Sequence, residues 1–132
     1  MKTARKRVLI ADCHEEVLIA LERMLEDAGF DTSTAWTGRD ALGLLQSKVF
    51  DLVLINKYLP DTECGDIFKT LEQTGAGIPG IVLQPRTPES TELEALRAVG
   101  ACDVVCQYAY PQIVEIVAGW LGGGKMGAAQ VA

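Results

Sequence analysis

A short unbroken apolar run at residues 52–55, within the segment DLVLINKYLP, most strongly limits the fold of this 132-residue chain. A run without polar alternation is typical of a strand buried on both faces, as in a parallel sheet covered by helices. Asn56 ends the run, at the carboxyl edge of the predicted strand, and Pro60 marks the turn beyond it. In open α/β sheets, ligands and chemistry lie at that edge. We therefore expect a functional site at Asn56, built around an amide rather than an acid.

The chain repeats this strand-then-helix pattern five times. The predicted strands are 8–11, 30–35, 52–55, 81–83 and 103–106, and the predicted helices are 15–28, 37–48, 65–73, 87–99 and 111–121. Thr37 is expected to cap the second helix, and Thr87 with Pro88 to begin the fourth. Parallel strands need right-handed helical crossovers. The pattern predicts an α/β fold of the flavodoxin-like type: a doubly wound, five-stranded parallel sheet in the order 2-1-3-4-5, with helices on both faces.

Composition favours one soluble domain. The chain is 48% hydrophobic and carries a net charge of −6, which argues against nucleic acid as a partner. No apolar run approaches the roughly 20 residues of a membrane span, and the N-terminus lacks a signal-peptide core. We expect a basic lead-in at 1–6, a folded domain at 7–121 and a flexible Gly/Ala-rich tail at 122–132, in a cytoplasmic protein without a membrane partner.

Four segments carry a family resemblance. VLIADCHEEVLIALERMLEDAGF, DLVLINKYLPD, IPGIVLQ and GACDVVCQ follow one another in this order. Together they resemble the CheY-like receiver domain of two-component response regulators, over residues 7 to 121. The resemblance implies a signalling module rather than an enzyme. It also implies a protein partner in trans, either a signalling kinase or an output protein.

The resemblance further implies five pocket positions for phosphorylation, and only Asp12 keeps the usual residue. The replaced positions are Cys13 for a second acid that usually ligates Mg²⁺, Asn56 for the phosphate-accepting aspartate, Gln84 for a serine or threonine, and Gln107 for a lysine. Val104 stands at the position of the aromatic switch residue. The chain therefore resembles a degenerate receiver, or pseudo-receiver.

The chemistry of these replacements agrees with a receiver that is not phosphorylated. An amide oxygen is a far weaker nucleophile than a carboxylate and cannot yield an acyl phosphate. One carboxylate beside a thiol and an amide is a poor Mg²⁺ site. Without metal and lysine, little stabilises a transferring phosphoryl group. We expect no metal, no cofactor and no phosphorylation, with Gln84 and Gln107 hydrogen-bonded to Asn56 across a neutral pocket.

Two alternatives stay open. Asn56 could be a substitution introduced into an otherwise working receiver, although the changes at Cys13, Gln84 and Gln107 argue against it. Alternatively, Asp12-Cys13-His14 resembles the start of the Asp-x-His cobalamin-binding motif of another flavodoxin-like family, in which the histidine ligates cobalt. Valine replaces the glycine of that motif three residues after His14.

The four cysteines stand at positions 13, 64, 102 and 106 and form no CxxC pair. The expected sheet order places Cys13 and Cys106 three strand spacings apart, roughly 14 Å. A disulfide requires Cα atoms within roughly 7 Å. We therefore interpret the cysteines as buried, inert thiols.

The resemblance also implies a contact surface formed by the fourth helix, fifth strand and fifth helix, at 89–99, 103–107 and 111–121. Its candidate contact residues are Arg97, Tyr108, Tyr110 and Trp120, because aromatic and arginine side chains often anchor interfaces. Trp120 could equally belong to the core. A homodimer through this surface is a further expectation.

Overall fold

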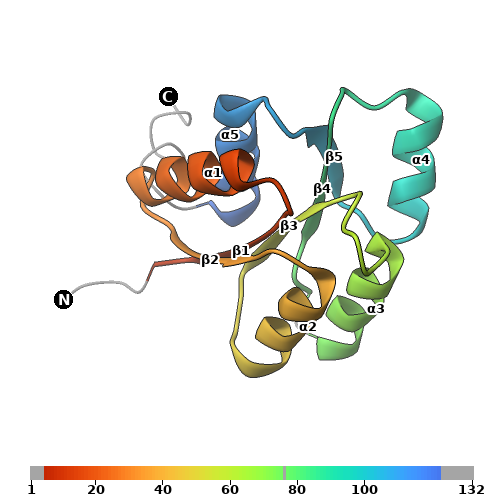
Figure 1. Cartoon of the computed structure of the whole chain (residues 1–132), viewed down its shortest axis with the longest axis horizontal. Helices are drawn as coiled ribbons and strands as arrows, with labels where there is room; N and C mark the ends of the chain where they lie inside the picture. The colour runs from red at the N-terminus through yellow and green to blue at the C-terminus, as the bar shows by residue number, and fades with distance from the viewer. Residues whose placement is uncertain (1–4, 76, 123–132) are drawn as a thin grey trace.

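A computed structural model describes residues 5–75 and 77–122 of the chain. It contains a five-stranded parallel sheet in the order β2-β1-β3-β4-β5, as the sequence predicted (Figure 1). The strands are β1 (Arg7–Ala11), β2 (Asp31–Ala35), β3 (Leu52–Asn56), β4 (Gly80–Gln84) and β5 (Asp103–Cys106). The expected tail, apart from Gly122, and most of the expected basic lead-in lie outside the described residues.

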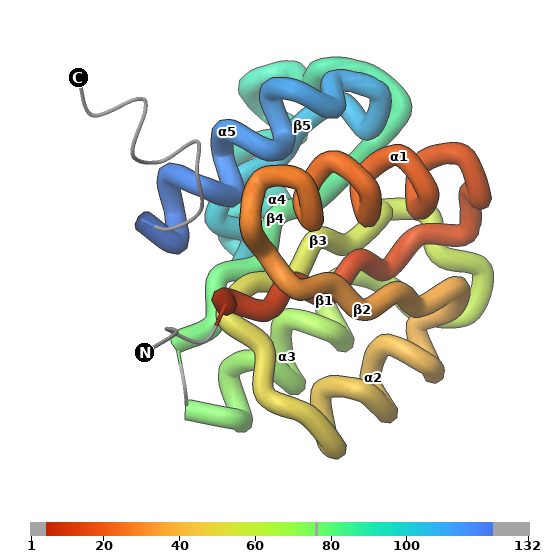
Figure 2. Tube along the Cα trace, turned by 90° about the vertical axis from the view of Figure 1, so that its left-hand side faces the viewer, coloured from red at the N-terminus to blue at the C-terminus, as the bar shows by residue number. Residues whose placement is uncertain are grey.

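Helices cover both faces of the sheet, because each crossover between parallel strands must pass over one face. They are α1 (Glu15–Asp27), α2 (Gly38–Ser47), α3 (Cys64–Thr74), α4 (Ser90–Ala98) and α5 (Tyr110–Leu121). Figure 2 shows α1 and α5 together on one face, and α2 and α3 on the other. The sheet thus separates two hydrophobic layers.

Side chains of β3 alternate between these two layers. Leu54 packs with Leu21 of α1 and Ile113 of α5, whereas Ile55 belongs to the layer that contains Ile67 of α3. Because both faces are covered, all five residues of β3 are buried. The unbroken apolar run in the sequence has its physical cause in this double coverage.

The start of α2 agrees with the sequence and the start of α4 does not. The Thr37 hydroxyl accepts a hydrogen bond from the backbone N–H of Asp40 at 3.1 Å, which confirms the predicted cap. In contrast, α4 begins at Ser90 with Glu89 as its N-cap. The backbone N–H of Glu89 donates to Glu92 Oε1 at 3.0 Å. A helix that begins at this later position therefore has a hydrogen-bond partner for the N–H of its N-cap residue.

Helix α4 is less buried than the other helices. No residue of α4 is buried, and Val99, directly after it, is 50% exposed. Leu93 and Leu96 are half-buried against the layer of α2 and α3. The reason is position: α4 lies at the side of the sheet next to β5, rather than over its face (Figure 1).

Candidate functional site

Four polar side chains are buried at the carboxyl edge of the sheet: Asp12, Asn56, Gln84 and Gln107 are each at most 1% exposed. Asp12 follows β1, Asn56 ends β3, Gln84 ends β4, and Gln107 follows β5. Parallel strands place their carboxyl ends at one edge, so the fold brings these residues together from distant parts of the chain. Their position agrees with the sequence prediction for Asn56.

Asn56 is the centre of this group. Its Nδ2 donates to Asp12 Oδ2 at 3.0 Å and to Gln107 Oε1 at 2.8 Å. Its Oδ1 accepts from the backbone N–H of Tyr58 at 2.8 Å. Both amide hydrogens and the amide oxygen are therefore engaged. The expected hydrogen bond between Asn56 and Gln107 is confirmed.

Gln84 does not join this network, which corrects the prediction for that residue. Its Nε2 donates to the backbone carbonyl of Arg86 at 3.1 Å, because the turn after β4 brings that oxygen within reach. The Gln84 Oε1 atom is buried and has no hydrogen-bond partner among the described residues. Gln84 contacts this group of residues through its backbone carbonyl, which accepts a hydrogen bond from the backbone N–H of Gln107 at 2.7 Å.

Asp12 is held by the loop after β1. Asp12 Oδ1 accepts from the backbone N–H of His14 at 2.8 Å and lies 2.6 Å from His14 Nδ1. Cys13, between them, places its Sγ 4.0 Å from His14 Nδ1 and 3.9 Å from the carbonyl oxygen of Tyr58. In the described part of the chain, His14 is the only ion-pair partner of Asp12.

The residues at this edge do not fit Mg²⁺, the ion that the family resemblance implies. Asp12 is the one fully buried carboxylate among the described residues, and Cys13 offers sulfur where an acid would offer oxygen. The Asn56 oxygen is engaged by Tyr58. Mg²⁺ needs hard oxygen ligands in a near-octahedral arrangement. Asp12, Cys13 and Asn56 therefore do not supply the set of ligands that Mg²⁺ requires.

Two further positions have a structural role. Val104, at the expected switch position, is buried in the layer of α2 and α3 and pairs with Val82 of β4. Its small side chain fills core space and has no aromatic ring to move. Cys64, the first residue of α3, directs its thiol to the backbone carbonyl of Asn56 at 3.8 Å. Burial raises the pKa of the Cys64 thiol to about 11.

The prediction of four buried thiols is wrong for three of them, since Cys13, Cys102 and Cys106 are half-buried. All four cysteines are free, as predicted. The three half-buried cysteines lie in or next to connections between elements, where packing is less complete than under α3.

Sequence reasoning missed a charged group around Glu92, in the first turn of α4. Glu92 accepts two hydrogen bonds from Arg86, at 2.6 and 3.0 Å, and its Oε2 lies 3.7 Å from Lys57 Nζ. The hydrogen bonds from Arg86 lower the pKa of Glu92 to about 2. Glu89 and Glu92 are three residues apart, and Leu93 and Leu96 follow them. This capping-box spacing in the sequence could have predicted the start of the helix.

Comparison with known proteins identifies the family. The family model described as "Response regulator receiver domain" matches residues 8–116, which is most of the chain. The chain belongs to this family. Receiver domains are signalling domains that interact with kinases and output domains in two-component systems, and this defines the class of function of the chain.

Relatives agree with the assignment. The chain is 29% identical over 96 residues to the transcriptional regulatory protein ZraR of Salmonella typhimurium, covering 73% of this chain and 22% of ZraR. It is 28% identical over 110 residues to the alkaline phosphatase synthesis transcriptional regulatory protein PhoP of Bacillus subtilis, covering 83% and 45%. The chain thus spans less than half the length of these curated relatives.

The fold is shared with solved receivers. A CheY-like receiver domain protein of Methanospirillum hungatei JF-1 superposes with a TM-score of 0.80 at 21% identity, covering 89% of this chain and 94% of that one.

None of the helices in the described part of the chain has the length and apolar character of a membrane-spanning helix.

The candidate contact residues of the receiver do not gather in one cluster. Tyr108 follows the carboxyl end of β5 and is 55% exposed. Trp120, near the end of α5, is 48% exposed and lines a pocket with Asp51 and Pro79, which precede β3 and β4. The two rings therefore lie at opposite edges of the sheet, and Trp120 is not a core residue.

The other two candidates differ from each other. Arg97 is exposed on α4, whereas Tyr110 is half-buried at the start of α5 and packs against the layer of α1 and α5. Tyr110 thus contributes to the core as well as to the surface, while Arg97 is available for contacts.

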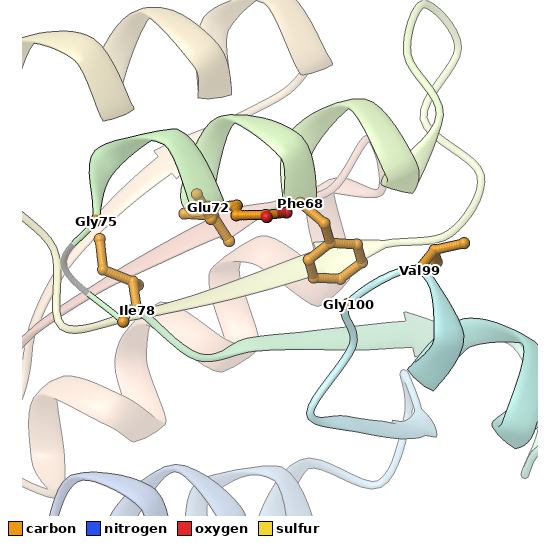
Figure 3. Close-up of a pocket in the computed structure, with 8 residues that line it drawn as sticks. Phe68, Glu72, Gly75, Ile78, Val99 and Gly100 are labelled. Atoms are coloured by element: carbon orange, nitrogen blue, oxygen red, sulfur yellow. The ribbon is translucent and has the colours of Figure 1, made fainter.

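A pocket lies between α3 and the segments that precede β4 and β5 (Figure 3). The ring of Phe68 points toward Gly100, where a Cβ atom would lie 3.0 Å from that of Phe68. Among the described residues that line it, Glu72 is the charged one, and Ile78 and Val99 contribute apolar side chains. Because this pocket lies at the amino edge of the sheet, it is separate from the polar group around Asn56.

Proposed function

We propose that this receiver domain does not accept a phosphoryl group, and that it signals by binding a protein partner in a phosphorylation-independent way. The observation that supports this most directly is the side chain of Asn56. It stands at the end of β3 and donates to both Asp12 and Gln107. An amide side chain at this position lacks the carboxylate that would attack phosphorus. The N–H groups and the oxygen of the Asn56 amide already form hydrogen bonds within the protein.

The charges around Asn56 support the same proposal. Phosphoryl transfer depends on cations that neutralise charge developing on the equatorial oxygens. The neighbouring side chains offer one carboxylate, from Asp12, and the neutral amide of Gln107. An incoming phosphoryl group would meet the buried charge of Asp12, and Gln107 stands where the family resemblance expects a lysine.

The test is intact-protein mass spectrometry after treatment with a small-molecule phosphodonor and Mg²⁺. Wild type and Asn56→Asp are expected to gain no phosphoryl mass. The triple variant Cys13→Asp, Asn56→Asp, Gln107→Lys restores a metal ligand, a nucleophile and a cation, and is the form with a physical basis for activity. A receiver with the usual acidic residues and lysine serves as the positive control for the phosphodonor.

A phosphorylated wild type would overturn the proposal. Phosphorylation of the Asn56→Asp variant alone would show that the site tolerates transfer without the other replacements. Since that variant could fold poorly, far-UV circular dichroism of each variant is recorded before the reaction.

The partner is proposed to bind at α4, β5 and α5, where Arg97, Tyr108 and Trp120 are exposed. A homodimer through the same elements would be isologous, so Arg97→Glu should act on both halves of the interface. Light scattering at high micromolar concentration distinguishes the cases. A wild type that stays monomeric there contradicts the dimer and leaves a different protein as the partner to be identified by pull-down.

A further inference from the structure

Three consecutive residues after β1 bring three different metal-binding groups together. The ligand atoms of Asp12, Cys13 and His14 all lie within 4.8 Å of one another. Asp12 contributes a carboxylate oxygen, Cys13 a thiol and His14 an imidazole nitrogen. His14 is the only histidine of the whole sequence, so the chain places its one imidazole at this point.

The distances are close to those of a coordinated ion. Zinc bonds of about 2.0 Å to nitrogen or oxygen and about 2.3 Å to sulfur set ligand atoms about 3.3 to 3.6 Å apart in a tetrahedron. Here His14 Nδ1 lies 4.0 Å from Cys13 Sγ and 2.6 Å from Asp12 Oδ1. The required shifts are on the order of 1 Å. The exposed ring of His14 and the half-buried thiol of Cys13 can make them by side-chain rotation.

The local charge favours a cation. Asp12 is fully buried, and among the described residues its one ion-pair partner is the partly exposed ring of His14, which is charged only when protonated. Asp12 accepts hydrogen bonds from Asn56 and from the backbone of His14, but a buried carboxylate is further stabilised when a cation compensates its charge. Gln107, which accepts a hydrogen bond from Asn56, supplies no positive charge.

The chemistry of the ligands selects the kind of ion. Thiolate and imidazole bind borderline and soft transition metals, whereas Mg²⁺ prefers oxygen ligands alone. We propose that Asp12, Cys13 and His14 bind one divalent transition-metal ion of the zinc class. Three protein ligands leave one tetrahedral position for water or for a ligand from a partner. The site is independent of phosphorylation, so its failure would leave the proposed function standing.

The experiment titrates untagged protein with Co²⁺, which substitutes for Zn²⁺ and gives a thiolate-to-metal charge-transfer absorption. Binding of one Co²⁺ per chain is expected, followed by displacement with Zn²⁺ and no displacement by excess Mg²⁺. A thiolate and a neutral imidazole are the forms that bind the metal, so the affinity should fall as the pH is lowered. Zn²⁺ should also raise the Tm of the wild type.

Matched variants locate the site. Cys13→Ser and His14→Gln should each weaken binding at least tenfold, and Cys13→Ser should abolish the charge-transfer band. Cys102→Ser and Cys106→Ser alter half-buried thiols elsewhere and should bind like wild type. The proposal is overturned if the wild type gives no thiolate band, or if Cys13→Ser retains it. Circular dichroism verifies the fold of each variant, and Cys13→Ala provides a second removal of the thiol if Cys13→Ser does not fold.

Discussion

Asn56 Nδ2 donates to Gln107 Oε1 at 2.8 Å, which joins a side chain at the end of β3 to one that follows β5. These strands are not neighbours, because β4 lies between them. Two strand spacings amount to about 10 Å, so the two amide side chains together bridge the end of β4. The bond closes the carboxyl edge with a neutral pair at the positions where the family resemblance expects an aspartate and a lysine.

Replacing Asn56 with aspartate should destabilise the protein by about 3 kcal/mol at neutral pH. The change removes both amide donors, so Asp12 Oδ2 and Gln107 Oε1 would face a second carboxylate instead. Burial and the like charge raise the pKa of the introduced carboxyl. Its ionisation therefore costs stability as the pH rises, and the variant should be closer to wild type at pH 5 than at pH 8. Urea unfolding measures both values.

Two comparisons make this result specific. Gln73→Glu is the same amide-to-acid change at an exposed position of α3, and should alter stability by no more than about 0.5 kcal/mol. Adding Gln107→Lys to Asn56→Asp should recover part of the loss, because it supplies a cation. An Asn56→Asp variant as stable as wild type at pH 8 would contradict the described network.

The two glutamines at the strand ends should respond differently to methionine. Gln107→Met leaves an N–H of Asn56 without its acceptor inside the protein, and should cost about 1–3 kcal/mol. Gln84→Met loses one bond to a backbone carbonyl but also removes a buried oxygen that has no partner among the described residues. Its change should be smaller, within about 1 kcal/mol. Equal losses in denaturant unfolding would argue against the different roles assigned to them.

Glu92→Gln should loosen α4, since this helix has no buried residue and Glu92 connects it to Arg86, Lys57 and the backbone of Glu89. Amide hydrogen exchange in α4 should become faster while exchange in the sheet stays unchanged. Glu94→Gln, at an exposed position of the same helix, is the matched control. Unchanged exchange in the Glu92→Gln variant would show that contacts of Leu93 and Leu96 suffice to hold the helix.

The same carboxylate predicts a pH dependence. The pKa of Glu92 is lowered from its ordinary 4.5 to about 2, mainly by hydrogen bonds from Arg86. A lowered pKa means that its stabilising contribution is complete above about pH 4.5 and is lost as the pH falls toward 2. The stability difference between wild type and Glu92→Gln should therefore shrink between pH 5 and pH 3. A difference that stays constant over this range would count against the ion pair.

Cys64 should be the least reactive of the four thiols. A pKa of about 11, against an ordinary 9.0, lowers its thiolate fraction at pH 8 about 100-fold, and burial also blocks access. Cys13, Cys102 and Cys106 should be alkylated first, as peptide mass spectrometry can follow. In denaturant all four should react. Labelling of Cys64 in the native protein at the rate of the other three would contradict its burial.

Much of the fold follows from sequence periodicity. Short apolar runs alternate with amphipathic segments, and parallel strands joined by helices admit few arrangements, so the sheet order and the position of Asn56 at its carboxyl edge could be predicted. The start of α4 could not be predicted from Thr87 and Pro88. It depends on which side chain accepts a hydrogen bond from the backbone N–H at the start of the helix. Here Glu92 accepts from the N–H of Glu89.

The sequence by itself determined which chemical groups meet at the carboxyl edge: one acid, three amides and a thiol, each within two residues of a strand end. Only the tertiary structure decided how they pair. Asn56 bonds to Gln107 across β4, whereas Gln84 turns to Arg86 in its own loop and His14 closes on Asp12. Strand ends are fixed by backbone pairing, which periodicity reveals. Hydrogen-bond partners are selected by side-chain reach over a few ångströms, which periodicity does not encode.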